Sequence, residues 1–253
     1  MSKIKMLLFD QDGTIIDTEK DGHRVAFNQA FKEYGYDVEW GVEEYHDLLQ
    51  ISGGSERMRY YYDKEGFGEE IPEDEVDELI EEIHDRKTEI FIEMLESGKL
   101  PVRPGIRRIM KEARERGLRL GICTTASLET ARAIAKRILG DVQFDFVLAG
   151  DMVENKKPDP EIYQLALKKS GLEPEEMIVF EDSRNGVVAA KAAGLNVVAT
   201  TNVYTRDEDL SQADIVVGCL GDPGGEKCDL IQANGKLEFN GVLTLDELLR
   251  FFE

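Results

Sequence analysis

Residues 4–14 of the chain are Ile-Lys-Met-Leu-Leu-Phe-Asp-Gln-Asp-Gly-Thr, an apolar run followed by two aspartates, Asp10 and Asp12, and by Gly13. The apolar run predicts a buried β-strand, and open α/β sheets bind their ligands beyond the carboxyl ends of such strands. Residues two apart on extended backbone point the same way, so one carboxylate can attack or hold a metal while the other moves protons. Gly13 allows a sharp turn close to an anion. This stretch indicates phosphoryl-transfer chemistry.

Two alternatives for this stretch are a calcium-binding loop and an ordinary surface turn. An EF-hand loop also begins Asp-x-Asp, but it needs glycine at position six, glutamate at position twelve and a preceding helix. Here those positions are Ile15 and Asp21, and a strand comes first. The calcium loop is therefore excluded, and the rest of the chain must decide between chemistry and a turn.

The composition is that of a globular protein with a strong negative charge. The chain has 253 residues, 42% of them hydrophobic, which is enough for one large domain or two small ones. Its 31 Lys and Arg residues against 52 Asp and Glu residues give a formal net charge of −21. Such a field repels nucleic acid and anionic membrane, so we expect neither as a partner. A phosphate-bearing substrate would need local positive charge or a metal ion.

The cysteines and histidines show no metal-binding or disulfide spacing. The cysteines are odd in number and lack a Cys-x-x-Cys pair, which argues against a zinc site and against a disulfide framework. We therefore expect a reducing, cytoplasmic location, in keeping with the absence of a signal peptide and of an apolar run of about 18 residues. The histidines are too scattered for a metal cluster and are expected to have surface or packing roles. The residues are Cys123, Cys219 and Cys228, and His23, His46 and His84.

Short β-rich runs alternate with helical patterns over most of the chain. This alternation predicts the α/β class, with a doubly wound parallel sheet. The runs are apolar on consecutive residues, as expected for strands covered on both faces. The predicted strands are Ile4–Asp10, Leu118–Cys123, Phe146–Ala149, Met177–Glu181, Asn196–Thr200 and Asp214–Val217.

Residues 18–101 interrupt the alternation with helical patterns, of which His23–Tyr34 and Val76–Leu95 are the clearest. We predict an inserted helical cap domain over residues 18–101 and a core domain formed by residues 1–17 and 102–253. An insertion directly after the strand that bears Asp10 would place the cap where it can close over the site and exclude water.

The tail after Thr205 has a weaker pattern. Residues 221–225 predict a loop, and Thr244–Phe252 predicts a capped C-terminal helix. Asn234-Gly235 suggests a small hairpin within Cys228–Phe239. No functional role follows from this pattern.

Polar residues follow three further predicted strands or loops at the edge that Asp10 occupies. Thr124-Thr125 offers a hydroxyl and backbone N–H groups to phosphate oxygens, although a helix N-cap is an alternative. Lys157 precedes the rigid turn Pro158–Pro160 and would offset charge in a transition state, with a surface turn as the alternative. Glu181-Asp182 ends a buried strand, where uncompensated charge is costly unless a cation binds. An oxygen-rich set with Asp10 suits Mg²⁺ better than it suits an N-cap.

The order of these motifs resembles the haloacid dehalogenase (HAD) superfamily, subfamily IA, over nearly all of the chain to about Val217. The resemblance implies a Rossmann-like core with a cap inserted after the first strand, and phosphatase or phosphomutase chemistry. It rests on Asp10-x-Asp12-Gly13-Thr14, Thr124, Lys157-Pro158 and Glu181-Asp182 in that order.

Further stretches resemble the CbbY-type branch, which is known for xylulose-1,5-bisphosphate phosphatases and lies next to β-phosphoglucomutase-like enzymes. In that branch, basic cap residues hold the distal phosphate of the substrate. The resemblance implies substrate contacts for Gly54, Arg57, Lys87 and His23 in the cap and for Thr125 in the core. The stretches are Glu44–Gln50, Ser52–Gly54, Lys87–Glu89, Arg103–Gly105, Leu148–Asp151 and Lys156–Pro160.

The resemblance also implies the catalytic roles. Asp10 attacks phosphorus to form an aspartyl phosphate, Asp12 is the general acid and then the base, and Thr124 and Lys157 bind the phosphate oxygens. The expected cofactor is Mg²⁺, held by Asp10, the backbone carbonyl of Asp12, Asp182 and Glu181, with Glu181 either a direct ligand or in the second shell.

The expected substrate is a small phosphorylated sugar. Two other functions remain open: a β-phosphoglucomutase-like phosphomutase, and a non-enzymatic phosphoacceptor regulatory domain. We expect a monomer, with a weak homodimer as the alternative.

Overall fold

The computed structural model describes residues 3–51, 53–69, 71–98 and 100–253, so Ser52 of the stretch Ser52–Gly54 lies outside the described residues. The chain divides into two compact units. The core unit consists of Met1–Asp17 and Pro101–Glu253, and the helical unit consists of Thr18–Leu100.

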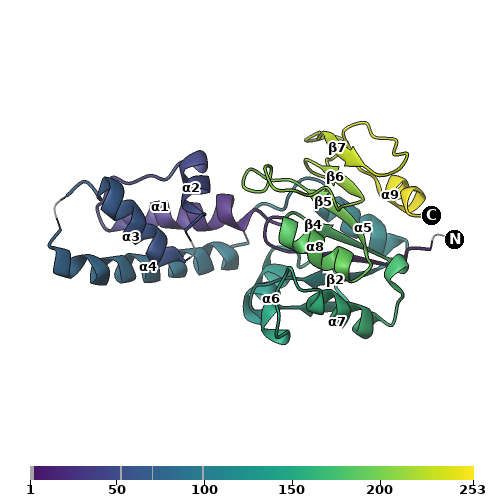
Figure 1. Cartoon of the computed structure of the whole chain (residues 1–253), viewed down its shortest axis with the longest axis horizontal. Coiled ribbons are helices and arrows are strands. Elements are labelled where there is room, and N and C mark those ends of the chain that lie inside the picture. Colours follow the sequence, from purple (N-terminus) through teal and green to yellow (C-terminus); the bar gives the residue numbers. More distant parts are fainter. Residues whose placement is uncertain (1–2, 52, 70, 99) are drawn as a thin grey trace. The chain divides into compact units, whose positions relative to one another are not determined.

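The core unit is built on a seven-stranded sheet of order β3-β2-β1-β4-β5-β6-β7 (Figure 1). Its first six strands are parallel, and β7 runs antiparallel to β6. The six predicted strands are confirmed to within two residues, and so is the doubly wound fold. The strands are β1 (Met6–Phe9), β2 (Arg119–Cys123), β3 (Phe146–Leu148), β4 (Met177–Glu181), β5 (Asn196–Thr200), β6 (Ile215–Val217) and β7 (Leu230–Ala233).

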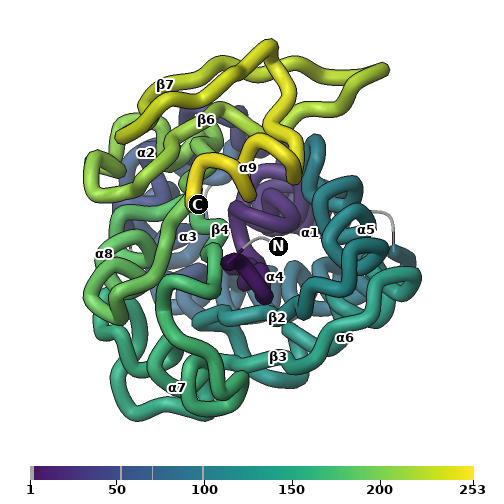
Figure 2. Tube along the Cα trace, turned by 90° about the vertical axis from the view of Figure 1, so that its right-hand side faces the viewer, coloured from purple at the N-terminus to yellow at the C-terminus, as the bar shows by residue number. Residues whose placement is uncertain are grey.

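Helices cover both faces of this sheet, with α7 and α8 on one face and α5, α6 and α9 on the other (Figure 2). Alternate residues of the strands, such as Met6 and Leu8 of β1, pack against Tyr163 of α7 and Val187 of α8. Burial on both faces explains why the strands are apolar on consecutive residues. The helices are α5 (Ile106–Glu115), α6 (Leu128–Arg137), α7 (Glu161–Ser170), α8 (Arg184–Ala192) and α9 (Leu245–Phe251), with 3-10 turns η2 (Gly150–Met152) and η3 (Pro174–Glu176).

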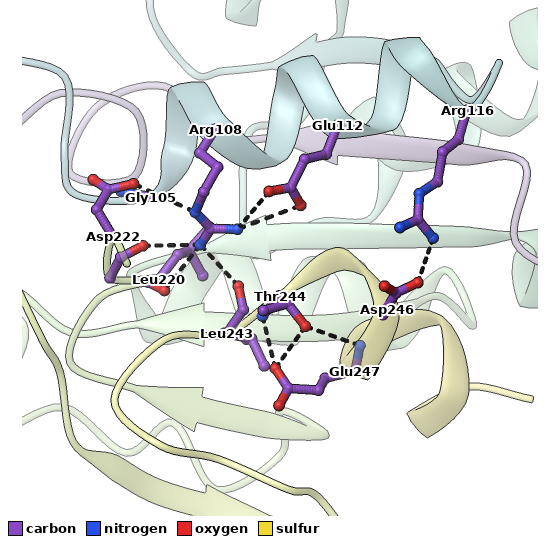
Figure 3. A network of polar contacts seen from close by, with 11 residues as sticks. Gly105, Arg108, Glu112, Arg116, Leu220, Asp222, Leu243, Thr244, Asp246 and Glu247 are labelled. Atoms are coloured by element: carbon purple, nitrogen blue, oxygen red, sulfur yellow. Dashed lines mark hydrogen bonds and ion pairs between the residues drawn. The ribbon is translucent and has the colours of Figure 1, made fainter. Parts of the chain in front are cut away.

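The tail is part of the core unit. The predicted C-terminal helix is confirmed as α9, which is N-capped by Thr244. The predicted hairpin at Asn234-Gly235 is wrong, because β7 pairs with β6 and the Asn234 side chain instead donates to the carbonyl of Ala213. Figure 3 shows how the tail docks on α5: Arg108 donates to the backbone carbonyls of Leu220, Gly221 and Leu243.

The prediction that no cysteines pair is wrong as well. Cys219 and Cys228 form a disulfide whose Cα atoms lie 5.5 Å apart, an ordinary separation for such a bridge. The odd number of cysteines argued against a disulfide, but the odd residue is Cys123, which is buried and unpaired. The loop between the paired cysteines contains Gly221, whose positive φ of 66° allows the chain to turn back on itself.

The helical unit confirms the two helices predicted within it. A short π-helix, η1 (Thr18–His23), leads into α1 (Arg24–Glu33), and α2 (Val42–Leu48), α3 (Gly54–Glu65) and α4 (Glu73–Glu96) follow. Its core is aromatic, since Phe27, Phe31, Trp40 and Tyr45 are all fully buried and their rings are in contact. Among the described helices, none combines the length and the apolar composition needed to cross a membrane.

Candidate active site

The acidic residues that follow β1 and β4 lie at the point where the strand order of the sheet reverses. From β1 the chain builds β2 and β3 on one side, and β4 then pairs with β1 on the other side. Ligands of open α/β sheets bind in the crevice beyond the carboxyl ends of strands at such a switch point. Asp10 follows β1 and Asp182 follows β4, so the predicted nucleophile and the predicted metal ligand share this position. The backbone N–H of Asp10 donates to the carbonyl of Phe180 at 2.9 Å.

Gly13 permits the close approach between the two acidic segments. Its φ is +87°, and a Cβ at this position would lie 2.1 Å from Oδ2 of Asp182. Any side chain would displace that carboxylate, and an L-residue would be strained at this φ. The glycine of the Asp-x-Asp-Gly stretch is therefore required by space as well as by backbone conformation.

Lys157 forms ion pairs with acidic residues at the ends of both strands. Its Nζ donates to Oδ1 of Asp10 at 2.6 Å, to Oε1 of Glu181 at 2.7 Å and to the carbonyl of Cys123 at 2.9 Å. The lysine side chain is only 4% exposed. The alternative of a surface turn at Lys157 is therefore wrong, and the ammonium lies among the predicted catalytic residues.

The buried charges shift one another's pKa values. Burial raises the pKa of Asp10 well above its usual range, Lys157 opposes this rise, and Glu181 adds to it. Burial likewise raises the pKa of Asp182, as do the neighbouring charges of Asp10 and Glu181. For Lys157, burial alone would lower the pKa, but the two carboxylates raise it above its usual value. Lys157 and Arg103 are thus opposed by at least three carboxylates, and the described site is short of positive charge.

The three carboxylates fit a divalent cation. Asp10, Glu181 and Asp182 are all buried, and each offers an oxygen within 4.8 Å of the others. Oxygen-only ligands with excess negative charge suit Mg²⁺. The N-cap alternative for Asp182 is wrong, because Ser183 caps α8 by accepting the N–H of Gly186.

Thr124 lies beside the predicted general acid. Its hydroxyl donates to Oδ2 of Asp12 at 3.3 Å and accepts the N–H of Ala126 at 3.1 Å. The cap of α6 is Ser127 rather than Thr124, so the N-cap alternative is wrong here too. Thr125, by contrast, is exposed.

Three residues of the site were given no role by the sequence prediction, although Arg103 stands in one of the stretches that resemble the CbbY-type branch. The hydroxyl of Tyr163 donates to Oε1 of Glu181, the oxygen that also accepts from Lys157. Asn202 donates to Asp182 at 2.7 Å, and the guanidinium of Arg103 donates to the carbonyl of Gly13. The rule that selected Thr124, a polar residue just past a strand end, would also have selected Asn202. No local signal distinguishes Tyr163 from an ordinary core tyrosine.

The predicted cap residues gather within the helical unit. Burial, together with the charges of Lys87, Arg57 and His84, lowers the pKa of His23 to about 3, which places these groups in one cationic cluster. Burial also lowers the pKa of Lys87 to about 8. Gly54 adjoins the same cluster, since a Cβ there would lie 2.3 Å from Nε2 of His84.

Arg57 and Lys87 differ in how they are held. Both side chains are buried, at 9% and 8% exposure, and neither takes part in an ion pair among the described residues. Arg57 donates to the carbonyls of Leu48 and Ile51 and to the hydroxyl of Tyr45. Lys87 lies over the ring of Phe27, with Nζ 4.6 Å from the centroid. Arg57 therefore stabilises the local fold, whereas the ammonium of Lys87 donates no hydrogen bond to any other described residue.

Comparison with known proteins gives a consistent family assignment. A family model described as haloacid dehalogenase-like hydrolase matches residues 4–194. The "CBBY-like protein" of Arabidopsis thaliana is 44% identical over 228 residues, which cover 88% of this chain and 72% of that protein. The "Phosphorylated carbohydrates phosphatase" of Thermotoga maritima is 32% identical over 192 residues, 76% of this chain and 82% of that protein.

A solved structure resembles the chain in both fold and sequence. It is a variant of CbbY from Rhodobacter sphaeroides in complex with xylulose-1,5-bisphosphate. The TM-score is 0.65 and the sequence identity 39%, with 88% of this chain and 97% of that chain covered.

Proposed function

Because this chain belongs to the haloacid dehalogenase-like hydrolases and is a phosphatase of the CbbY kind, we propose that it hydrolyses small sugar phosphates through a phosphorylated Asp10. The preferred substrate is a sugar bisphosphate of the xylulose-1,5-bisphosphate type. The observation that carries the proposal is the arrangement at the β1–β4 switch point, where Lys157 bridges Asp10 and Glu181 beside Asp182. Membership of a hydrolase family decides against the phosphoacceptor regulatory domain.

The acidic residues have separate roles in this proposal. Asp10 attacks phosphorus, the bond between phosphorus and the sugar oxygen breaks, and an aspartyl phosphate forms. Asp12 gives its proton to the leaving sugar oxygen, then takes a proton from the water that attacks the aspartyl phosphate. Its contact with Thr124, at 3.3 Å, orients the carboxyl group for both transfers.

The remaining core residues bind the phosphate and the cofactor. Lys157 and Thr124 face the equatorial oxygens of the transferring group, where negative charge must be offset. Asp10, Glu181, Asp182 and the backbone carbonyl of Asp12 would hold Mg²⁺. When bound, the ion supplies the positive charge that lets an anionic carboxylate approach an anionic phosphate.

The cationic cluster of the helical unit binds the second phosphate in this proposal. Lys87 is the main contact, because its ammonium is not tied to the protein by a hydrogen bond among those of the described residues. His23 and the backbone at Gly54 line the same cluster, and Arg57 adds charge from a fixed position.

The test is a screen for phosphate release from sugar monophosphates and bisphosphates, with and without Mg²⁺. Asp10→Asn should lower kcat by at least about 10³-fold, or roughly 4 kcal/mol, because an amide cannot attack phosphorus. The matched control is Asp207→Asn, which changes an aspartate with 78% side-chain exposure and should leave kcat unchanged. A well-folded Asp10→Asn variant with a tenth of the wild-type rate would contradict the proposal. Transfer of phosphate to a second sugar hydroxyl, without net release, would identify a mutase.

A further inference from the structure

Asn202 follows the carboxyl end of β5, and its side chain contacts a predicted metal ligand. Its Nδ2 donates to Oδ2 of Asp182 at 2.7 Å. Asp182 is 5% exposed, and the same oxygen faces Gly13, where a Cβ would lie 2.1 Å away. The carboxylate of Asp182 is therefore confined on one side by backbone and on another by the Asn202 amide.

A turn determines which way the Asn202 amide faces. Its Oδ1 accepts the backbone N–H of Tyr204 at 2.9 Å and that of Thr205 at 3.1 Å. The backbone N–H of Asn202 donates in turn to Oγ1 of Thr205 at 3.2 Å. A flipped amide would place its NH₂ against two N–H donors and its oxygen against a carboxylate. Only one orientation satisfies every group, and it points a donor at Asp182.

The turn is itself anchored to the sheet. The N–H of Thr201 donates to the carbonyl of Val217 at 2.9 Å. Arg103 donates to Oγ1 of Thr200 at 2.8 Å and to the carbonyl of Thr201, and the same guanidinium contacts the carbonyl of Gly13. The turn that contains Asn202 is thus hydrogen-bonded to β6, and Arg103 bonds both to this turn and to the loop after β1.

We propose that Asn202 is a positioning residue, which fixes the rotation of the Asp182 carboxylate and thereby sets the affinity of the site for its divalent cation. A carboxylate can rotate about its last side-chain bond, and a ligand that must first be ordered binds a cation more weakly. The amide orders the carboxylate without adding charge to a cluster that already has three carboxylates. The inference rests on the proposed function, since it assigns a role toward the Mg²⁺ of that site.

The test compares two substitutions of Asn202 that differ in their effect on the turn. Asn202→Ser keeps a side-chain oxygen that can accept the N–H groups of the turn, but it is too short to reach Asp182. Asn202→Ala removes both functions. Thr205→Val is the matched control, because it removes the Oγ1 contact of the turn and leaves the Asn202 amide intact.

Mg²⁺ binding is measured by calorimetry on the full-length, substrate-free protein, together with the melting temperature in EDTA. We expect the Kd for Mg²⁺ to rise about 10-fold to 100-fold in both Asn202 variants. It should stay within about 2-fold of wild type in Thr205→Val. The melting temperature in EDTA should fall for Asn202→Ala and Thr205→Val, and less for Asn202→Ser.

The possible outcomes separate the two proposals. A wild-type Kd in Asn202→Ser, with weakened binding only in Asn202→Ala, would show that Asn202 acts through the turn and would overturn its positioning role alone. An equal rise in Kd for Thr205→Val would overturn it in the same way. Absence of Mg²⁺ binding by the wild-type protein would overturn both this inference and the proposed cofactor.

Discussion

Replacing Lys157 by methionine should destabilise the protein and abolish its activity, because this ammonium is the positive charge that bridges Asp10 and Glu181. Its Nζ lies 2.6 Å from one carboxylate and 2.7 Å from the other, and its side chain is 4% exposed. At an effective dielectric constant of about 20, each pair has a gross attraction of roughly 6 kcal/mol. Much of this offsets the cost of burying the charges.

The net effect of the substitution is smaller than the gross attraction. Removing one partner of a buried ion pair costs about 3 to 5 kcal/mol, because the remaining charge stays buried without compensation. We expect a loss of this size in the free energy of unfolding at pH 8, measured by urea denaturation in EDTA. The loss should be smaller at pH 5, because burial raises the pKa of Asp10 and protonation then removes its charge.

The matched control is Lys156→Met, which removes the exposed neighbouring lysine and should change the free energy of unfolding by less than about 0.5 kcal/mol. The rate of phosphate release should fall by at least about 10³-fold in Lys157→Met and stay at the wild-type level in Lys156→Met. A loss below about 1 kcal/mol at pH 8, or an equal loss at pH 5 and pH 8, would refute the electrostatic reasoning.

Three further predictions concern the second phosphate, the cation and the disulfide. Lys87→Met should lower kcat/KM for a sugar bisphosphate about 10-fold to 100-fold but leave the hydrolysis of p-nitrophenyl phosphate unchanged. The affinity of the wild-type protein for the bisphosphate should fall as the pH rises through 8, where Lys87 loses its proton. Equal losses on both substrates would contradict this prediction. Burial raises the pKa values of Asp10 and Asp182, so their ionisation above about pH 4 should increasingly destabilise the metal-free protein. The gain in melting temperature on adding Mg²⁺ should therefore be larger at pH 8 than at pH 5. A gain that does not depend on pH would count against this prediction. Reducing the disulfide between Cys219 and Cys228, which are nine positions apart, should lower the free energy of unfolding by about 2 to 3 kcal/mol. A reductant should therefore lower the melting temperature of the wild-type protein and leave that of the double serine variant unchanged. A lower melting temperature in both proteins would argue against the disulfide.

The parallel strands were predictable because burial on both faces leaves a continuous apolar signal. Phe180 and its neighbours in β4 show this signal most clearly, and the motifs at the strand ends then follow from the topology. β7 was missed because it is a short edge strand with exposed side chains such as Ile231, which is 58% exposed. Its pairing with β6 depends on tertiary contacts that the pattern of the tail does not contain.

The site was predictable where chemistry and strand ends coincide, as at Asp10 and Asp182. It was not predictable where a residue acts through another residue. Tyr163 lies on a helix and is indistinguishable in sequence from a packing residue, although its hydroxyl holds Glu181. Arg57 was predicted as a substrate contact, and only the fold shows that three of its nitrogens donate to groups of the protein.

The stereochemical course of hydrolysis at phosphorus tests the central claim, a phosphorylated Asp10, most directly. A thiophosphate analogue of the substrate, whose phosphorus carries sulfur and two different oxygen isotopes, is hydrolysed in water labelled with the third isotope, and the configuration of the released inorganic thiophosphate is determined. Attack by Asp10 followed by attack of water comprises two in-line displacements, each of which inverts phosphorus, so the account predicts overall retention. Overall inversion would mean a single direct attack by water and would contradict the role of Asp10 as nucleophile.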